Sequence, residues 1–248
     1  MKKLCGILIA GIFLIAPANA QMSVGITLDS YTGYIWRGYV LGADDKIVAQ
    51  PGIEVGFGET GLSLGAWGSW FVQDRVDETA PDTQTQNVDE LDFYADYSRS
   101  LSDDMGLGVS IGYIQYVFPS ADEDSNLSQE AYIGLSLDNA ISPALTFYYD
   151  FGLVEAWYAS LSGGYDIPLG SEDGQVLSIG ASVAMSNYVV DETGANKIGF
   201  NDLTVTASLS CNACAISIAP TIGFSYADTE INPDNRTIWG GVSIGFGQ

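Results

Sequence analysis

Carboxylates and tyrosines are the side chains through which this sequence could do chemistry, because the chain has no histidine. Its 248 residues include 31 Asp and Glu against 8 Lys and Arg, for a formal net charge of −23, and 14 Tyr. Without His there is no imidazole general base, no Ser-His triad and no imidazole metal ligand. So few basic residues also exclude nucleic acid as a partner, since phosphate binding needs clustered Lys and Arg.

A carboxylate pair such as Asp92 and Asp96 is the remaining candidate for acid–base catalysis. A hydrolase needs a base that activates a nucleophile or a water molecule, and nothing in the surrounding sequence distinguishes this pair. We therefore expect that the protein is not an enzyme, has no catalytic residues and needs no cofactor.

The acidic segment Asp122–Asn126 begins like a calcium-binding loop, with oxygen-bearing side chains at alternate positions. An EF-hand loop also needs Gly at its sixth position and Glu at its twelfth. Leu127 and Ile133 occupy those positions, so the EF-hand is excluded and we expect no dedicated metal site. Weak binding of divalent cations at acidic loops and a merely solvated acidic surface both stay open.

The first twenty residues have the order of a secretory signal peptide. Lys2 and Lys3 precede an apolar run from Leu4 to Ala16, and the small residues Ala18-Asn19-Ala20 follow. We expect cleavage before Gln21, which leaves residues 21–248 as one domain. The run is shorter than the about 20 apolar residues of a spanning helix. No later stretch is long enough without a charge, a Gly or a turn signal, so a membrane-embedded chain would have to be a β-barrel.

The body of the chain alternates apolar residues with small or polar ones, which predicts β-strands with two different faces. Leu177, Ile179, Ala181, Val183 and Met185, for example, alternate with Ser, Gly and Ala. Twelve strand-like runs follow from this pattern: 23–38, 47–58, 62–73, 89–100, 106–118, 129–138, 144–153, 156–167, 176–187, 199–211, 213–226 and 237–246.

Two all-β folds fit this alternation, a secreted β-sandwich and an outer-membrane barrel. Most runs exceed the 5–6 residues of a common sandwich strand. Long and short connections alternate, as in barrels with periplasmic turns and extracellular loops, except at the brief Val154-Glu155. Aromatic residues near strand ends, Tyr34 and Trp36 among them, would form interfacial girdles. We predict an all-β, transmembrane, antiparallel up-and-down β-barrel of about 12 strands.

Cys211 and Cys214 bracket Asn212-Ala213 between two predicted strands. In an exported protein such a pair predicts a disulfide, whereas a thioredoxin-like redox motif would need a helix start in a βαβ context. We therefore predict a Cys211–Cys214 disulfide in a periplasmic turn.

Five segments carry a family likeness: Tyr34-Ile35-Trp36-Arg37-Gly38, Gln50-Pro51-Gly52-Ile53, Gly61-Leu62-Ser63-Leu64-Gly65-Ala66-Trp67-Gly68-Ser69, Glu90-Leu91-Asp92-Phe93-Tyr94-Ala95-Asp96-Tyr97 and Gly112-Tyr113-Ile114-Gln115-Tyr116-Val117-Phe118-Pro119. They resemble the TorF-like family of outer-membrane porins. The match covers about the first half of the chain after the signal peptide. The resemblance implies a barrel in the bacterial outer membrane with pore activity, in contact with membrane lipid.

With the apolar residues facing lipid, the other face of each strand should line the interior, where ionisable groups at membrane depth belong. The predicted pore-lining residues are Asp29, Tyr31, Arg37, Glu54, Glu90, Asp92, Tyr94, Asp96, Glu130, Tyr132, Asp150 and Asp166. Arg37 should pair with inward carboxylates across neighbouring strands, either at a charged constriction or in a network that plugs the barrel.

Twelve strands lie between the eight of a filled barrel and the 16–18 of an open channel. We therefore expect a narrow porin for passive diffusion of small solutes, and its acidic interior favours cations. The alternative is a closed structural or adhesive barrel that acts through its acidic extracellular loops.

Overall fold

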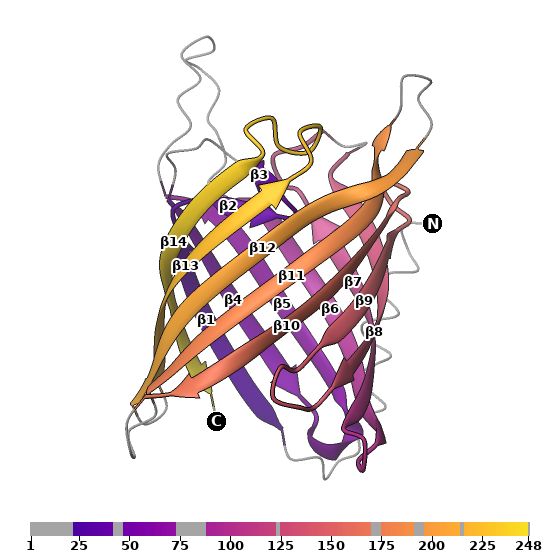
Figure 1. Ribbon diagram of the computed structural model, residues 1–248. Coiled ribbons are helices and arrows are strands. Elements are labelled where there is room, and N and C mark those ends of the chain that lie inside the picture. Colours follow the sequence, from indigo (N-terminus) through magenta and orange to yellow (C-terminus); the bar gives the residue numbers. More distant parts are fainter. Residues whose placement is uncertain are drawn as a thin grey trace.

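Twelve antiparallel strands close into a single barrel, as the sequence predicts (Figure 1). The computed structural model describes residues 22–41, 47–72, 88–122, 125–169, 175–190, 196–213 and 216–247. The barrel strands are β1 (Ser23–Tyr31), β4 (Val48–Gly56), β5 (Leu62–Phe71), β6 (Val88–Ser102), β7 (Leu107–Val117), β8 (Leu127–Leu137), β9 (Ala144–Asp150), β10 (Trp157–Pro168), β11 (Gln175–Val190), β12 (Asn196–Ala213), β13 (Ile216–Ala227) and β14 (Arg236–Gly247). Each pairs with its neighbours in sequence, and β1 closes the barrel against β14.

The alternation of apolar with small or polar residues places these two sets of side chains on opposite faces of the barrel wall. Large apolar side chains such as Ile26, Ile133 and Leu161 are 46%, 49% and 52% exposed. An outward band of exposed apolar side chains is what a lipid-facing barrel surface requires. The opposite face of each strand carries Gly, Ser, Thr, Tyr and the carboxylates.

The inward face combines glycines with tyrosine rings for a steric reason. A Cβ on Gly65 would lie 2.1 Å from the ring of Tyr94, and a Cβ on Gly112 would lie 2.2 Å from the ring of Tyr132. Each ring thus lies across a glycine of the neighbouring strand, so the inner wall has no room for another side chain at these two positions.

The connections are short at one end of the barrel, where the C-terminal end also lies (Figure 1). Residues 57–61, which include the short 3₁₀ helix η1 (Gly58–Thr60), and 103–106 are two of them. By analogy with outer-membrane barrels this is the periplasmic end. None of the described residues belongs to a helix that is long and apolar enough to cross a membrane.

The connection between β9 and β10, which the sequence left doubtful, is a tight turn built on Asp150. Its Oδ1 accepts hydrogen bonds from the backbone N–H groups of Gly152 (2.9 Å) and Val154 (3.2 Å), and its Oδ2 accepts one from Ser128 Oγ (2.7 Å). The strand count therefore stays at twelve, although β9 ends at Asp150 and not at residue 153.

The predicted Cys211–Cys214 disulfide is not supported, because Cys211 has a free thiol. Strand β12 continues past the expected turn at Asn212-Ala213, so that Cys211 pairs with Ile218 of β13 in the ladder. Cys214 lies outside the described residues, as do the predicted signal peptide and its cleavage site before Gln21. Signal peptide and cleavage site stay predictions.

The two faces of β7 give a direct test of this arrangement. Ile111 is 53% exposed near the middle of the strand, whereas its neighbour Ser110 faces the interior. We expect Ile111→Arg to lower the free energy of unfolding by about 2–4 kcal/mol, the cost of Arg at mid-membrane on a barrel's lipid face. Ser110→Arg, whose side chain would point into a cavity of the interior, should lower the free energy of unfolding much less. Urea titration of barrels folded in lipid vesicles measures both, and equal costs would contradict the assigned faces.

Candidate functional site

A small hairpin leaves the barrel wall after β1 and enters the interior. Its strands are β2 (Tyr34–Trp36) and β3 (Tyr39–Leu41), which pair with each other and not with the barrel. The sequence predicted a single strand over 23–38; the wall strand ends instead at Tyr31. There the backbone N–H of Thr32 donates to the carbonyl of Gly240 (2.9 Å), and the N–H of Gly240 donates to Thr32 Oγ1 (3.2 Å). Figure 1 shows the hairpin towards the end with the longer connections.

The tip of the hairpin is a two-residue turn at Arg37 and Gly38. Both have positive φ, 50° and 83°, as the twist of a two-residue β-hairpin favours. A Cβ on Gly38 would lie 2.7 Å from Ala227 Cβ and 2.9 Å from Asp202 Cβ. Glycine therefore allows the tip to press against β12 and β13, the wall opposite β5 and β6.

Arg37 makes a buried ion pair with Glu130 of β8. Arg37 Nη1 donates to Glu130 Oε2 and Nη2 to Oε1, both at 2.7 Å, and the side chains are only 9% and 1% exposed. Tyr116 OH also donates to Glu130 Oε1 (3.0 Å), and Arg37 Nη1 donates to the hydroxyl of Tyr188. Burial opposes the charge of Arg37, but the hydrogen bonds and charge of Glu130 raise its pKa above the ordinary value. The guanidinium is thus a permanent charge inside the barrel.

Aromatic rings surround this guanidinium. Its Cζ lies 4.6 Å from the ring centroid of Trp36, 4.6 Å from Tyr148, 4.5 Å from Tyr158 and 5.8 Å from Tyr188. These separations fall within the about 6 Å range of cation–π attraction. The chain therefore uses a carboxylate and aromatic faces together to hold a buried cation.

The backbone of the tip is fixed by Asn201 on β12. Asn201 Nδ2 donates to the carbonyl of Arg37 (2.8 Å), and its Oδ1 accepts from Ser186 Oγ (2.6 Å). Asp202 Oδ1 in turn accepts from Tyr158 OH (3.0 Å). Asn201 reaches the interior beside Asp202 because the register of β12 against β11 shifts at this point.

The base of the hairpin contacts the other side of the barrel. The ring of Tyr34 lies 5.5 Å from that of Trp67 on β5. Burial raises the pKa of Tyr34, and the charges of Glu90 and Asp92 on β6 and a hydrogen bond with Glu90 raise it further. The hairpin therefore crosses the interior from β5 and β6 to β12 and β13.

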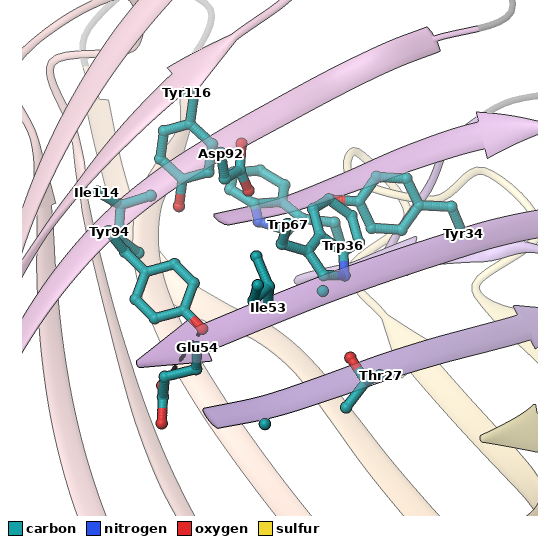
Figure 2. Close-up of a pocket in the computed structure, with 12 residues that line it drawn as sticks. Thr27, Tyr34, Trp36, Ile53, Glu54, Trp67, Asp92, Tyr94, Ile114 and Tyr116 are labelled. Carbon is teal, nitrogen blue, oxygen red and sulfur yellow. Dashed lines mark hydrogen bonds between the residues drawn. The ribbon is translucent and has the colours of Figure 1, made fainter. Parts of the chain in front are cut away.

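Below the hairpin lies a pocket of about 620 Å³ (Figure 2). Its wall has the aromatic rings of Tyr34, Trp36, Trp67, Tyr94 and Tyr116, the hydroxyl of Thr27 and the carboxylates of Glu54 and Asp92. Towards the short turns lies a second cavity of about 850 Å³, whose wall includes the small residues Ser98, Ser110 and Ser136 and the apolar residues Leu107 and Leu137. Two cavities therefore lie between the hairpin and the short turns.

The structure places the predicted site residues in three settings. Eight lie at inward positions of wall strands: Asp29, Tyr31, Glu54, Tyr94, Asp96, Tyr132, Asp166 and Asp92. Glu90, Glu130 and Arg37 belong to the layer around the hairpin, and Asp150 holds the β9–β10 turn. That these residues line a conducting pore stays a prediction.

The structure of this site differs from the sequence prediction in two details. Arg37 pairs with a carboxylate as expected, but from a hairpin tip and not across neighbouring wall strands. Tyr34 and Trp36 are not girdle residues at the membrane surface, because they line the interior pocket.

The site also contains five residues that were not predicted from the sequence: Tyr116, Tyr158, Tyr188, Asn201 and Asp202. Tyr116 shares its phase with the inward Gly108 and Gly112, so alternation could have identified it. Asn201 depends on the irregular register of β12, for which the sequence has no local signal.

No metal centre is formed by the described residues, since they contain no group of three or more His, Cys, Asp or Glu that could hold an ion. Two residues of the acidic segment 122–126 lie outside the described part. Weak cation binding there stays untested.

Solved structures of porins have this fold. The KdgM porin in complex with disordered oligogalacturonate is 13% identical, with a TM-score of 0.54 over 90% of this chain and 98% of that chain. A second KdgM porin structure (12%, TM-score 0.55) has the same coverage. The NanC porin is 12% identical, with a TM-score of 0.51 over 90% of this chain and 97% of that chain. At such identities the likeness shows an outer-membrane porin fold and no more.

The resemblance to TorF-like porins is thus confirmed only in its coarser part, the porin-like barrel. The comparison with curated proteins gives no match. A family profile described as "Bacterial protein of unknown function (Gcw_chp)" matches residues 16–238, and the chain therefore belongs to the Gcw_chp family.

Proposed function

We propose that the protein is a narrow channel of the bacterial outer membrane that lets small solutes diffuse passively and prefers cations. The observation that carries the proposal is the hairpin β2–β3, which crosses the barrel interior next to cavities of about 620 Å³ and 850 Å³. A constriction of this kind sets the size limit of a channel, while the wall beneath it sets charge preference.

The charge of the interior supports cation preference. Among the described residues, Arg37 and Glu130 form the one ion pair. Glu54, Asp96 and Asp166 accept hydrogen bonds from Tyr94, Tyr132 and Ser178 hydroxyls at 3.2, 2.7 and 2.6 Å. Hydroxyl donors do not cancel a carboxylate's charge, so the interior should have a negative potential that raises the local concentration of cations.

A related fold supports the role of a channel. The KdgM porin was solved in complex with oligogalacturonate, so a barrel of this fold can admit a solute. The absence of His from the sequence still argues against an enzyme, because the usual general base is missing.

The second candidate is a closed structural or adhesive barrel that acts through its acidic loops. The buried Arg37–Glu130 pair and its aromatic surroundings favour it, because a hairpin held so firmly could block the interior.

Planar-bilayer recording across a KCl gradient separates these candidates. We expect a measurable conductance and a reversal potential of the sign that cation preference gives. Glu54→Gln should move the reversal potential towards zero, since it removes an interior charge. Glu59→Gln, in the exposed turn helix η1, is the matched control and should change it little. Anion preference would contradict the proposed selectivity, and a complete lack of conductance would favour the closed barrel.

A further inference from the structure

We propose that the pocket beneath the hairpin binds organic cations, namely solutes with an amidinium, guanidinium or ammonium group on a small apolar body. The inference deepens the proposed function and rests on it in one respect, since a solute must reach the pocket through the barrel. Figure 2 shows the aromatic rings around the pocket, with the carboxylates of Asp92 and Glu54 at two separate points of its wall.

Asp92 is the strongest pointer to a cation. Its side chain is 9% exposed, it lines the pocket, and its Oδ1 has no hydrogen-bond partner among the described residues. A buried carboxylate oxygen without a partner is costly. The Asp92 side chain also shares a hydrogen bond with Glu90, two residues earlier on the same face, and a bound cation would favour the charged form of this pair.

The walls of the pocket suit the apolar part of such a solute. Five aromatic rings line it, and Gly25 and Gly52 leave space along β1 and β4. No Lys or Arg is among the lining residues. A volume of about 620 Å³ is ordinary for a small-molecule site, and faces of Trp and Tyr attract cations.

The same molecule already holds one cation in this way. On the tip side of the hairpin, the Arg37 guanidinium contacts the Glu130 carboxylate and four aromatic rings. The pocket has the same two elements, carboxylate and aromatic faces, and Trp36 takes part in both. A neutral sugar could stack on these rings, but it would leave the carboxylate of Glu54, which accepts a hydrogen bond from the neutral hydroxyl of Tyr94, without a counter-charge.

Calorimetry on the folded barrel in detergent tests the pocket without requiring transport. Benzamidinium, benzamide and benzoate have nearly the same shape and differ in charge. We expect benzamidinium to bind at least about tenfold more tightly than benzamide, the effect of one charge-assisted hydrogen bond, and benzoate not to bind. Equal affinities for benzamidinium and benzamide, or tighter binding of maltose than of benzamidinium, would overturn the proposal.

Charge-removing variants locate the site. Asp92→Asn should weaken benzamidinium binding by about tenfold, and Glu54→Gln should also weaken it. Glu59→Gln removes an exposed carboxylate in η1 that does not line the pocket and should leave the affinity unchanged. Heat-dependent gel mobility shows which variants fold; if Asp92→Asn does not, Glu54→Gln, whose side chain is exposed, decides. An equal loss with Glu59→Gln would overturn the assignment.

Binding and conductance are measured separately, so the two proposals can fail separately. Charge-selective binding without conductance supports the pocket and contradicts the channel. Conductance without charge-selective binding contradicts the pocket and supports the channel.

Discussion

Replacing Arg37 with alanine is expected to lower the free energy of unfolding by about 3–5 kcal/mol, because it leaves a buried carboxylate without its counter-charge. Glu130 is only 1% exposed, and Arg37 gives it two hydrogen bonds of 2.7 Å. The remaining donor that contacts Glu130 Oε1 is the neutral hydroxyl of Tyr116. Urea titration of the folded barrel, followed by tryptophan fluorescence, measures the change.

Three further variants identify the cause of this loss. Arg99→Ala removes an exposed arginine that contacts Tyr97 and the carbonyl of Glu59, and such surface contacts are worth about 0–1 kcal/mol. Adding Glu130→Gln to Arg37→Ala should recover part of the stability, since position 130 then no longer carries a buried charge that lacks its counter-charge. The stability of Arg37→Lys should lie between those of the natural chain and Arg37→Ala, because lysine keeps the charge but cannot bind both carboxylate oxygens. If Arg37→Ala and Arg99→Ala had the same effect, the buried pair would not hold the hairpin.

Much of the fold could be predicted from the sequence because the membrane imposes a local rule. Every second residue of a barrel strand faces lipid. Apolar residues such as Ile26, Ile133 and Leu161 therefore show which face of their strand points outward, without any knowledge of the neighbouring strands. The same phase puts the carboxylates of Glu54, Asp96 and Asp166 inside. Strand number and faces follow from this periodicity.

The hairpin could not be predicted in the same way. Tyr34, Trp36 and Arg37 have the residue types of a strand end, and their place in the interior depends on contacts with Asn201 and Glu130, far along the chain. The predicted disulfide is not supported for a related reason. Strand β12 extends beyond its expected end because its ladder with β13 continues to Ala213, a pairing that no spacing of two cysteines reveals.

Removing the hairpin should raise the single-channel conductance severalfold. A short Gly-Ser linker in place of residues 34–41 removes the rings of Tyr34 and Trp36 and the Arg37 side chain from the level at which the hairpin crosses the interior. A twelve-stranded barrel without the hairpin is wider than the filled eight-stranded barrels, so ions should pass freely. Tyr39→Phe is the matched control, because it keeps the whole hairpin and the ring that packs on Trp36 and Tyr188. Its conductance should equal that of the natural chain.

If the β2–β3 hairpin is the constriction of an aqueous path through the barrel, its removal must change the current through a single barrel. Single-channel recording compares the natural chain and the hairpin-replaced chain in the same planar bilayers. This claim predicts a small but measurable conductance for the natural chain and a severalfold larger one after replacement. Equal conductances would contradict the claim, and so would a natural chain that never conducts.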